Sequence, residues 1–335
     1  MTARVVVTLV SWRSLPAGLG PVVQAWAAQE PPPSRISILC NEDPDGADAA
    51  ALNRLLAAGH HEVPVTLVSQ PDNSGFAGGH NRLLAEAFAG GADAAVVVNP
   101  DLVPLPGALA RLADPALPDD SLRGPTLLSA VAGTYEPEGT IDSSGIRWTR
   151  TGRHLDARQG EPALDLPDQP YRVPGISGAC LFVPRAAYVR VIDGSGEFFD
   201  GSFLAYREDA ELGLRADRLG VQSWIVPAAQ ALHVRSVRGT TRRGVSEHAN
   251  RLGVRNRFLI AFKFGTDRPG GWLGAPLRDA VVLVGVMVHE RSSWSGVMEA
   301  WQLRGVMRAK GRRMRRSARD NRLHHPARVA GGRHG

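Results

Sequence analysis

The sequence predicts an α/β protein built on a mostly parallel central sheet that is flanked by helices. Two observations predict this class. Short apolar strand-like runs alternate with helical stretches through the first hundred residues, and a polar cluster follows each predicted strand. Such alternation implies right-handed crossovers, which bring the carboxyl ends of the strands to one edge of the sheet. Ligands of α/β proteins bind beyond that edge, so we expect the polar clusters to form the binding site.

The first hundred residues are expected to hold four strands and their connecting helices. The first run is apolar and β-branched without alternation, which is typical of a strand buried on both faces. The strands are expected at 4–10, 35–39, 63–68 and 94–98, and the helices at 22–28, 47–58 and 82–89.

The rest of the chain is less regular. Gly175 and Gly178 interrupt an apolar run and indicate a close approach of backbone or ligand. The predicted helices are 104–112, 185–191 and the amphipathic stretches after 256, the predicted strands are 173–183, 221–226 and 231–234, the predicted hairpin is 140–151, and the predicted surface loop is 152–169.

Cysteine usage and hydropathy indicate a cytoplasmic protein. Cys40 and Cys180 provide neither a disulfide framework nor metal-ligand spacing, which fits a reducing compartment. The chain enters a strand-like run at once, so we expect no signal peptide. The longest apolar run, 280–288, has nine residues, well short of the roughly 20 that span a bilayer.

The net charge of +6 is unevenly distributed. Residues 304–335 contain eleven Lys/Arg and one acid, whereas residues 1–303 contain 28 basic and 32 acidic side chains. The basic end suits an anionic partner, either a membrane surface or nucleic acid, or it is simply a solvated tail. Because the body is mildly acidic, we expect no nucleic-acid binding.

Three carboxylates open the helix expected after residue 207. Glu208, Asp209 and Glu211 follow an aromatic, glycine-broken turn. The helix dipole favours acids in a first turn, so these residues are explained as well by helix initiation as by chemistry. Glu211 can also pair with Arg215 one turn later.

Other polar residues sit at predicted strand ends. Asp101, in Asn-Pro-Asp, is placed to bind a divalent ion that bridges two phosphates, or to form an ordinary Asx turn. His233 follows a strand and is either structural or a metal ligand. Six arginines then follow between 238 and 257, and they suit a diphosphate leaving group or a solvated face. The loop 73–81 has three glycines and two asparagines but matches no dinucleotide or Walker pattern.

Taken in order, these motifs resemble family 2 inverting glycosyltransferases, in particular the rhamnosyltransferase-like branch. The resemblance covers about residues 4–260. It rests on Asn-x-Gly-Phe-Ala-Gly-Gly-x-Asn at 73–81, Asn-Pro-Asp at 99–101, Ser-Gly-Ala-Cys-Leu at 177–181, Phe-Phe-Asp-x-x-Phe-x-x-Tyr-x-Glu-Asp-x-Glu-Leu at 198–212, and His233.

The resemblance implies a GT-A fold that binds a nucleotide-diphosphate sugar through Mg²⁺ or Mn²⁺. Asp101 would stand in the metal-binding element and His233 would complete the metal site. Asp209 would be the general base, with Glu208 orienting it or contacting the acceptor. The residues expected to bind the donor nucleotide and its diphosphate are Ser11, Asn41, Asn73, Gly75, Asn81, Asp101, Arg238 and Arg255.

Two positions depart from the family pattern. Cys40 stands where the family has an aspartate that helps to hold the nucleotide base, although Asn41 and Asp45 match. The first strand ends in Ser-Trp-Arg at 11–13 rather than in an Asn-Tyr-like pair. Neither departure touches the groups assigned to catalysis.

The sequence therefore predicts an inverting, metal-dependent glycosyltransferase on a cytoplasmic membrane face. The donor is expected to be a dTDP- or UDP-sugar, with rhamnose the first candidate, and the acceptor a glycan or lipid-linked saccharide. We expect a GT-A domain at 1–262, an amphipathic helical extension at 263–310 that contacts the membrane, and a basic, disordered tail at 311–335. The alternatives are a nucleotidyltransferase, a non-catalytic nucleotide-sugar-binding protein and, remotely, nucleic-acid binding through the tail.

Overall fold

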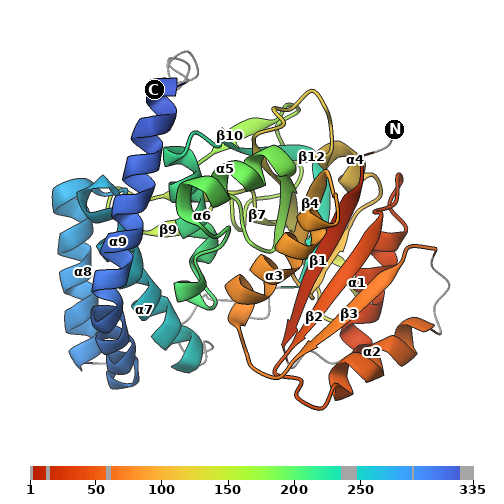
Figure 1. Ribbon diagram of the computed structural model, residues 1–335, viewed down its shortest axis with the longest axis horizontal. Helices are drawn as coiled ribbons and strands as arrows, with labels where there is room; N and C mark the ends of the chain where they lie inside the picture. Colours follow the sequence, from red (N-terminus) through yellow and green to blue (C-terminus); the bar gives the residue numbers. More distant parts are fainter. Residues whose placement is uncertain (1–2, 13–15, 58–61, 235–246, 289, 325–335) are drawn as a thin grey trace.

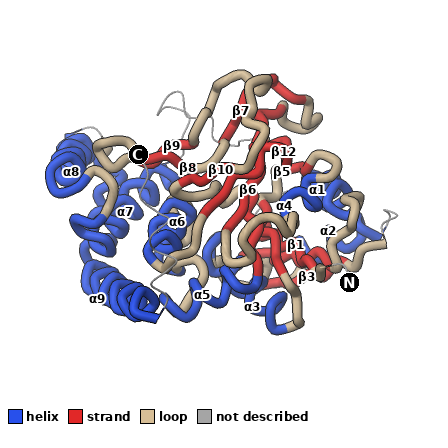
Figure 2. Tube along the Cα trace, turned by 90° about the horizontal axis from the view of Figure 1, so that it is seen from above, coloured by secondary structure: helices blue, strands red, loops and turns tan. Residues whose placement is uncertain are grey.

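The computed structural model describes residues 3–12, 16–57, 62–234, 247–288 and 290–324. Its centre is a ten-stranded sheet in the order β10-β12-β6-β11-β4-β1-β2-β3, with β5 paired to β12 and β7 to β6. Three C-terminal helices gather on the side of the molecule away from β1–β3 (Figures 1 and 2). The predicted α/β class is confirmed.

The strands agree with the sequence prediction most closely in the first half of the chain. Their bounds are β1 Val5–Trp12, β2 Arg35–Asn41, β3 Val65–Gln70, β4 Ala94–Val98, β5 Leu102–Pro104, β6 Leu122–Ala130, β7 Pro137–Ser143, β8 Ile146–Trp148, β9 His154–Asp156, β10 Tyr171–Val173, β11 Cys180–Pro184 and β12 Ser223–His233.

The helices alternate with the strands up to β4 and then accumulate at the C-terminal end. Their bounds are α1 Pro16–Ala27, α2 Ala47–Ala57, α3 Gly75–Ala89, α4 Ala108–Leu112, α5 Arg185–Ser195, α6 Glu208–Arg218, α7 Glu247–Phe264, α8 Gly271–Val288 and α9 Trp294–His324, with short 3₁₀ turns at η1 Gly201–Phe203, η3 Gly265–Asp267 and η4 Arg291–Ser293.

The half of the sheet formed by β1 to β4 is parallel, and one antiparallel strand joins it to the other half. β3, β2, β1 and β4 run parallel to one another. β11 is antiparallel to β4 and β6, and β12 is parallel to β6. The carboxyl ends of β1, β2, β4 and β12 therefore lie on the same edge, as the polar clusters predicted.

Alternate residues of each central strand pack into different cores. Val7 of β1 and Val96 of β4 belong to the core under α1, α2 and α4. Val6 and Val97 belong to the core under α3, α5 and α6. This strict alternation of an apolar strand between two helical layers explains why the strand sequences are continuously apolar. Each fully buried valine or leucine contributes about 1.5–3 kcal/mol.

The C-terminal helices form a third core on the body of the protein. Phe203, Leu214 and Leu219 of the body pack there with side chains of α7, α8 and α9. α7 crosses the boundary predicted at 262, and α9 continues as a helix to His324. The prediction of disorder is therefore wrong for residues 311–324, because α9 packs along α7 and places Met307 and Met314 in this core. Residues 325–335 lie outside the described residues.

Several predicted elements differ from the observed ones. The strand expected at 173–183 is split into β10 and β11, while the strands expected at 221–226 and 231–234 form one strand, β12. α3 begins at Gly75, so most of the predicted loop 73–81 is the first half of a helix. The predicted surface loop 152–169 contributes β9, which pairs with β8.

Within the described residues, one helix is long and apolar enough to cross a membrane. This helix is α8. Its 18 residues have a mean hydropathy of 1.5, and 17% of this stretch is buried in the protein. The expectation that no stretch meets this length is wrong, since the apolar sequence resumes before the Arg278-Asp279 pair. Asp279 is itself buried and bonded to Arg257 and Arg268.

Candidate functional site

The segment between Phe199 and Glu208 is a strained loop held from α7. Leu204, Tyr206 and Arg207 have φ values of 60°, 68° and 69°, a left-handed conformation that is costly for side chains of this size. The buried amide nitrogen of Asn256 lies 2.9, 2.8 and 2.7 Å from the carbonyl oxygens of Phe203, Ala205 and Tyr206. A single α7 side chain thus fixes the loop that leads into α6.

Buried ion pairs also hold the segment between Phe199 and Glu208, through Asp200 and through Glu211 in α6. The Glu211–Arg215 pair is confirmed, with Nη2 of Arg215 2.9 Å from Oε2 of Glu211 and both side chains fully buried. Nζ of Lys263 lies 2.6 Å from Asp200 and 2.7 Å from Glu211. Nζ of Lys310, on α9, lies 2.5 Å from Asp200. Burial alone would raise the pKa of Asp200, but Lys263 and Lys310 hold that pKa well below its usual value.

Asp209 and Glu208, at the start of α6, have different hydrogen-bond partners. Oδ2 of Asp209 accepts from the backbone N–H of Gly178 at 3.1 Å, and Oδ1 accepts from that of Ala210 at 2.7 Å. Oε2 of Glu208 is buried, and no partner for it occurs among the described residues. Donated N–H groups favour the ionised form of a carboxyl, so Asp209 is the better candidate to carry the negative charge.

The pKa directions agree with that assignment. Burial raises the pKa of both carboxyls, and the charge of Asp209 raises the pKa of Glu208 further, to well above its ordinary value. The N–H groups of Gly178 and Ala210 oppose the rise for Asp209, while the charge of Asp156 adds to it. We therefore expect Glu208 to be the more readily protonated of the two carboxyls.

The second group of candidates joins the ends of β4 and β12. Nε2 of His233 lies 3.3 Å from Oδ1 of Asp101, and Nδ1 lies 2.8 Å from Oδ2 of Asp142 on β7. Burial would lower the pKa of His233, but hydrogen bonds to Asp101 and Asp142 raise it to about 9. Asp142 orients the imidazole so that its second nitrogen faces Asp101.

Asp101 presents a carboxylate oxygen, which suits Mg²⁺ or Mn²⁺, and the neighbouring Nε2 of His233 would join it as a ligand once the imidazole is neutral. The described part of the chain contains no group of three or more His, Cys, Asp or Glu side chains arranged to hold a metal ion. Two protein ligands are enough for an ion whose remaining ligands are substrate phosphates and water, because proteins usually bind Mg²⁺ with few side chains and leave the other positions to phosphates and water. The residues present therefore fit the ion that the resemblance implies.

Of the described residues predicted to bind the nucleotide, Asp101 lines the cavity described below, whereas Ser11, Asn41, Asn73, Gly75 and Asn81 are absent from its lining and hold neighbouring loops together. Asn41 bridges two loops: its Nδ2 donates to the carbonyl of Gly75 at 3.2 Å and its Oδ1 accepts from the hydroxyl of Ser74 at 3.0 Å. Asn73 accepts from the N–H of Gly75 at 2.8 Å. Ser11 is buried at the end of β1 beside Cys40.

Asn81 and Gly75 connect these loops to the strained segment between Phe199 and Glu208. Asn81 donates to the carbonyl of Phe199 and accepts from its N–H, both at 2.8 Å. Gly75 has a φ of +68°, and a Cβ at this position would lie 2.5 Å from the carbonyl oxygen of Leu204. Asn81 and Gly75 of the 73–81 motif therefore join the predicted nucleotide-binding loops to the segment that precedes Asp209.

Arg255 contacts Ser202 and Glu299 rather than the predicted nucleotide-binding loops, and Arg238 lies outside the described residues. The Arg255 guanidinium donates to the carbonyl of Ser202 at 2.8 Å and pairs with Glu299 of α9 at 3.0 Å. It is absent from the residues that line the cavity described next. Cys40, the departure in the base loop, is buried, and its pKa is raised to about 11 by burial and by Asp43 and Asp48.

One cavity of about 620 Å³ brings the main candidates together. It is lined by Asp101, His233, Glu208 and Asp209, and by side chains from strands, loops and α7. Residues in the wall that the sequence did not assign to the site include Trp12, Phe76, Ile146, His154, Asp156, Tyr206 and Arg207.

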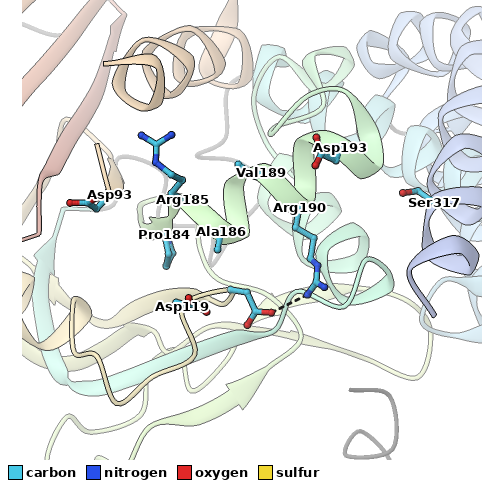
Figure 3. A pocket seen from close by; sticks show the side chains of 10 residues that line it. Asp93, Asp119, Pro184, Arg185, Ala186, Val189, Arg190, Asp193 and Ser317 are labelled. Carbon is cyan, nitrogen blue, oxygen red and sulfur yellow. Dashed lines mark hydrogen bonds and ion pairs between the residues drawn. The ribbon is translucent and has the colours of Figure 1, made fainter. Parts of the chain in front are cut away.

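A second cavity of about 720 Å³ lies at the other end of the strands (Figure 3). Its wall includes Asp93, which precedes β4, and Arg190, which pairs with Asp120 at 3.0 Å. Because ligands of α/β sheets bind at the carboxyl ends of strands, the cavity around Asp101 and Asp209 is the candidate active site.

Comparison with known proteins decides the family. The family described as "Glycosyltransferase like family 2" matches residues 3–255, about three quarters of the chain. The chain belongs to this family. It is a glycosyltransferase.

Curated relatives extend the match. The glycosyltransferase is 30% identical over 269 residues to "N-acetylglucosaminyl-diphospho-decaprenol L-rhamnosyltransferase" of Mycobacterium tuberculosis, strain CDC 1551 / Oshkosh. The same values hold for the protein of strain ATCC 25618 / H37Rv. The alignment covers 73% of this chain and 79% of each relative. The predicted rhamnosyltransferase-like resemblance is thus confirmed.

Solved structures support the fold. The crystal structure of GalNAc-T7 with UDP, GalNAc and Mn²⁺ aligns with a TM-score of 0.59 at 14% identity. The alignment covers 78% of this chain and 48% of that chain, so the glycosyltransferase spans about half the length of that protein. This likeness confirms the GT-A fold.

Several residues of the site carried no local signal in the sequence. Asp142 lies in a segment that the sequence predicts to be a hairpin, and Asn256 lies where the predicted amphipathic helical stretches begin. His154 lies within a segment predicted to be a surface loop. Their roles depend on partners that are distant in the sequence, such as Asp142 and His233, which are 91 residues apart.

Proposed function

We propose that this glycosyltransferase moves a sugar from a nucleotide-diphosphate sugar to a hydroxyl group of a lipid-linked saccharide, with inversion at the anomeric carbon. One observation carries the proposal: Asp209 and the Asp101–His233 pair line the same cavity. The mycobacterial relatives, named for rhamnosyl transfer to an N-acetylglucosaminyl-diphospho-polyprenol, support rhamnose as the sugar and a prenyl-diphosphate-linked acceptor. A dTDP- or UDP-sugar is the proposed donor.

Asp209 acts as the general base of the reaction. Its carboxylate takes the proton of the acceptor hydroxyl while the oxygen forms a bond to the anomeric carbon. The bond from that carbon to the diphosphate breaks, and its electron pair leaves with the nucleoside diphosphate. Glu208, which holds its proton, stays neutral beside the base and leaves Asp209 as the single charge of the pair.

Asp101 and His233 would hold a Mg²⁺ or Mn²⁺ ion, which would supply positive charge against the leaving diphosphate. Asp142 keeps the imidazole oriented, and Asn41, Asn73 and Gly75 shape the loop beside the nucleotide. Asn81 holds that loop against the segment that leads to Asp209 through its two hydrogen bonds to the backbone of Phe199.

The enzyme rests on the cytoplasmic face of the membrane through α8. One side of α8 exposes Leu273, Leu277, Val281, Val284 and Val288, which follow at helical spacing and are each at least 55% exposed. The opposite side is fastened to the body through the buried Asp279. A helix fastened in this way lies along a bilayer surface with its apolar side in the lipid rather than crossing the bilayer.

The decisive experiment is a transfer assay with purified enzyme and N-acetylglucosaminyl-diphospho-farnesol as acceptor. We expect turnover with a dTDP- or UDP-sugar, loss of turnover in EDTA, and recovery with Mn²⁺. Asp209→Asn should lower kcat about 10²–10⁴-fold with donor KM retained. Asp217→Asn, an exposed aspartate on the same helix, is the matched control. No transfer and no nucleotide binding with any donor would overturn the proposal.

A further inference from the structure

Five arginines from five parts of the chain lie near one another beside the catalytic cavity, which Arg207 lines. We call them the arginine cluster. They come from the β8–β9 turn, the residue before α6, α7, the segment before α8, and α8 itself; they are Arg153, Arg207, Arg257, Arg268 and Arg278.

Direct contacts hold these elements together. Nη1 of Arg207 lies 3.1 Å from Nδ1 of His154 on β9. Nε of Arg257 lies 2.6 Å from Asp279, which also pairs with Arg268. The β8–β9 turn lies against the start of α8 so closely that a Cβ at Gly152 would be 2.4 Å from the carbonyl oxygen of Pro269.

Positive charge in the cluster exceeds the negative charge paired with it. Among the described residues, Asp279 is the carboxylate that forms ion pairs with cluster members. Arg257 is only 6% exposed, and its Nη2 has no hydrogen-bond partner among the described residues. A buried guanidinium with an unused donor is costly unless an anion binds it.

The electrostatic state of Arg207 agrees with this imbalance. Its pKa is lowered to about 10, first by burial and then by the charges of Arg257, Arg153 and Arg278, while Asp209 opposes the shift. Arg207 thus interacts electrostatically with both the proposed base and the other arginines. A bound anion would remove the repulsion that these guanidiniums exert on one another.

The cluster lies between the catalytic cavity and the apolar side of α8. Arg207 and His154 are part of the cavity wall. Arg268 and Arg278 flank the first turns of α8, where Trp272 is 77% exposed and Leu273 is 63% exposed. Figures 1 and 2 both place α8 at the outer edge of the molecule, on the far side of α6 and α7 from the sheet.

We propose that the arginine cluster binds the diphosphate of a prenyl-diphosphate-linked acceptor, with the sugar in the cavity at Asp209 and the prenyl chain along α8. This inference rests on the proposed function. The donor diphosphate is assigned to Asp101 and His233, at the ends of β4 and β12. The cluster surrounds Arg207, two residues before the base, so the anion it binds belongs to the acceptor.

The test compares two acceptors that share a sugar and a tail. One is N-acetylglucosaminyl-diphospho-farnesol, and the other is farnesyl N-acetylglucosaminide, which has no diphosphate. The variant is Arg153→Ala with Arg278→Ala, which leaves the buried Arg257–Asp279 pair intact. The control is Arg147→Ala, an exposed arginine of β8 that lies between the inward-facing Ile146 and Trp148.

We expect the wild-type enzyme to prefer the diphosphate acceptor in kcat/KM. The double variant should lose at least about tenfold of that preference, because hydrogen bonds from guanidinium groups to phosphate are stronger than neutral ones. The loss should appear in the acceptor KM, while the donor KM stays constant. In a titration without donor, the affinity for the diphosphate acceptor should fall by a similar factor. Arg147→Ala should behave as wild type.

Three outcomes would overturn the inference. The double variant could retain the full preference, or it could lose activity equally on both acceptors. A wild-type enzyme that transfers to both acceptors but binds them equally would also contradict it, while leaving the proposed function standing. Failure of the wild type to use any donor would instead count against the proposed function itself.

Discussion

Nζ of Lys263 lies 2.6 Å from Oδ2 of Asp200, and both side chains are buried. This ion pair joins α7 to the aromatic loop that leads into α6. Lys310 of α9 meets the same carboxylate. The C-terminal helices are therefore part of the structure that positions Asp209, in addition to their proposed contact with the membrane.

Lys263→Met is expected to destabilise the protein by about 3–5 kcal/mol, because it leaves buried carboxylates without one of their cationic partners. Denaturant unfolding followed by circular dichroism measures this change. The matched control is Arg82→Ala, which removes an exposed helical pair worth about 0.3–0.5 kcal/mol. A loss for Lys263→Met no larger than that of the control would contradict the prediction.

Acid should weaken the same network. The pKa values of Asp200 and Glu211 are lowered from 3.8 and 4.5 by Lys263, Lys310 and Arg215 against the effect of burial. Their contribution is therefore fully present above those ordinary values and is lost as pH falls toward the lower folded values. Below pH about 4, the free energy of unfolding should fall by about 1.4 kcal/mol per pH unit for each group.

Unfolding measured at pH 6, 4 and 3 tests the sign and the size of this effect. Asp200→Asn should show a shallower loss between pH 4 and 3 than the wild type, because one of the titrating groups is gone. Equal slopes for the two proteins would show that other carboxyls govern the acid limb.

Glu208→Gln is expected to keep kcat within about tenfold of wild type, whereas Asp209→Asn loses 10²–10⁴-fold. The reason is that Glu208 already holds a proton, so an amide replaces a neutral group. Activity requires ionised Asp209, and it should fall as pH decreases through a pKa above the ordinary 3.8. That acid limb should barely move in Glu208→Gln; a large downward shift would mean that Glu208 is charged.

Leu273→Ser combined with Leu277→Ser should weaken binding to anionic lipid vesicles by at least about tenfold, since burying each leucine in lipid contributes up to about 1.5–3 kcal/mol. Vesicle co-sedimentation measures the partition. Leu164→Ser is the control, because Leu164 is 93% exposed and lies outside α8. If both proteins bind vesicles as the wild type does, α8 does not contact the membrane.

Local sequence determined the strands of the parallel half, the positions of Asp101 after β4 and His233 at the end of β12, and the position of Asp209 in the first turn of α6. A strand buried on both faces must be continuously apolar, and a helix start accepts carboxylates, so both features are written in neighbouring residues. The Glu211–Arg215 pair was accessible for the same reason, since one helical turn separates its members.

Only the tertiary structure decided what those residues contact. Asp142 reaches His233 because β7 and β12 both pair with β6, and Asn256, Lys263 and Lys310 reach the loop that leads into α6 because α7 and α9 pack on the body. The same packing turns Arg255 toward Glu299. Strand order and helix docking bring together residues far apart in the chain, and no periodicity of 2.0 or 3.6 residues records such partners.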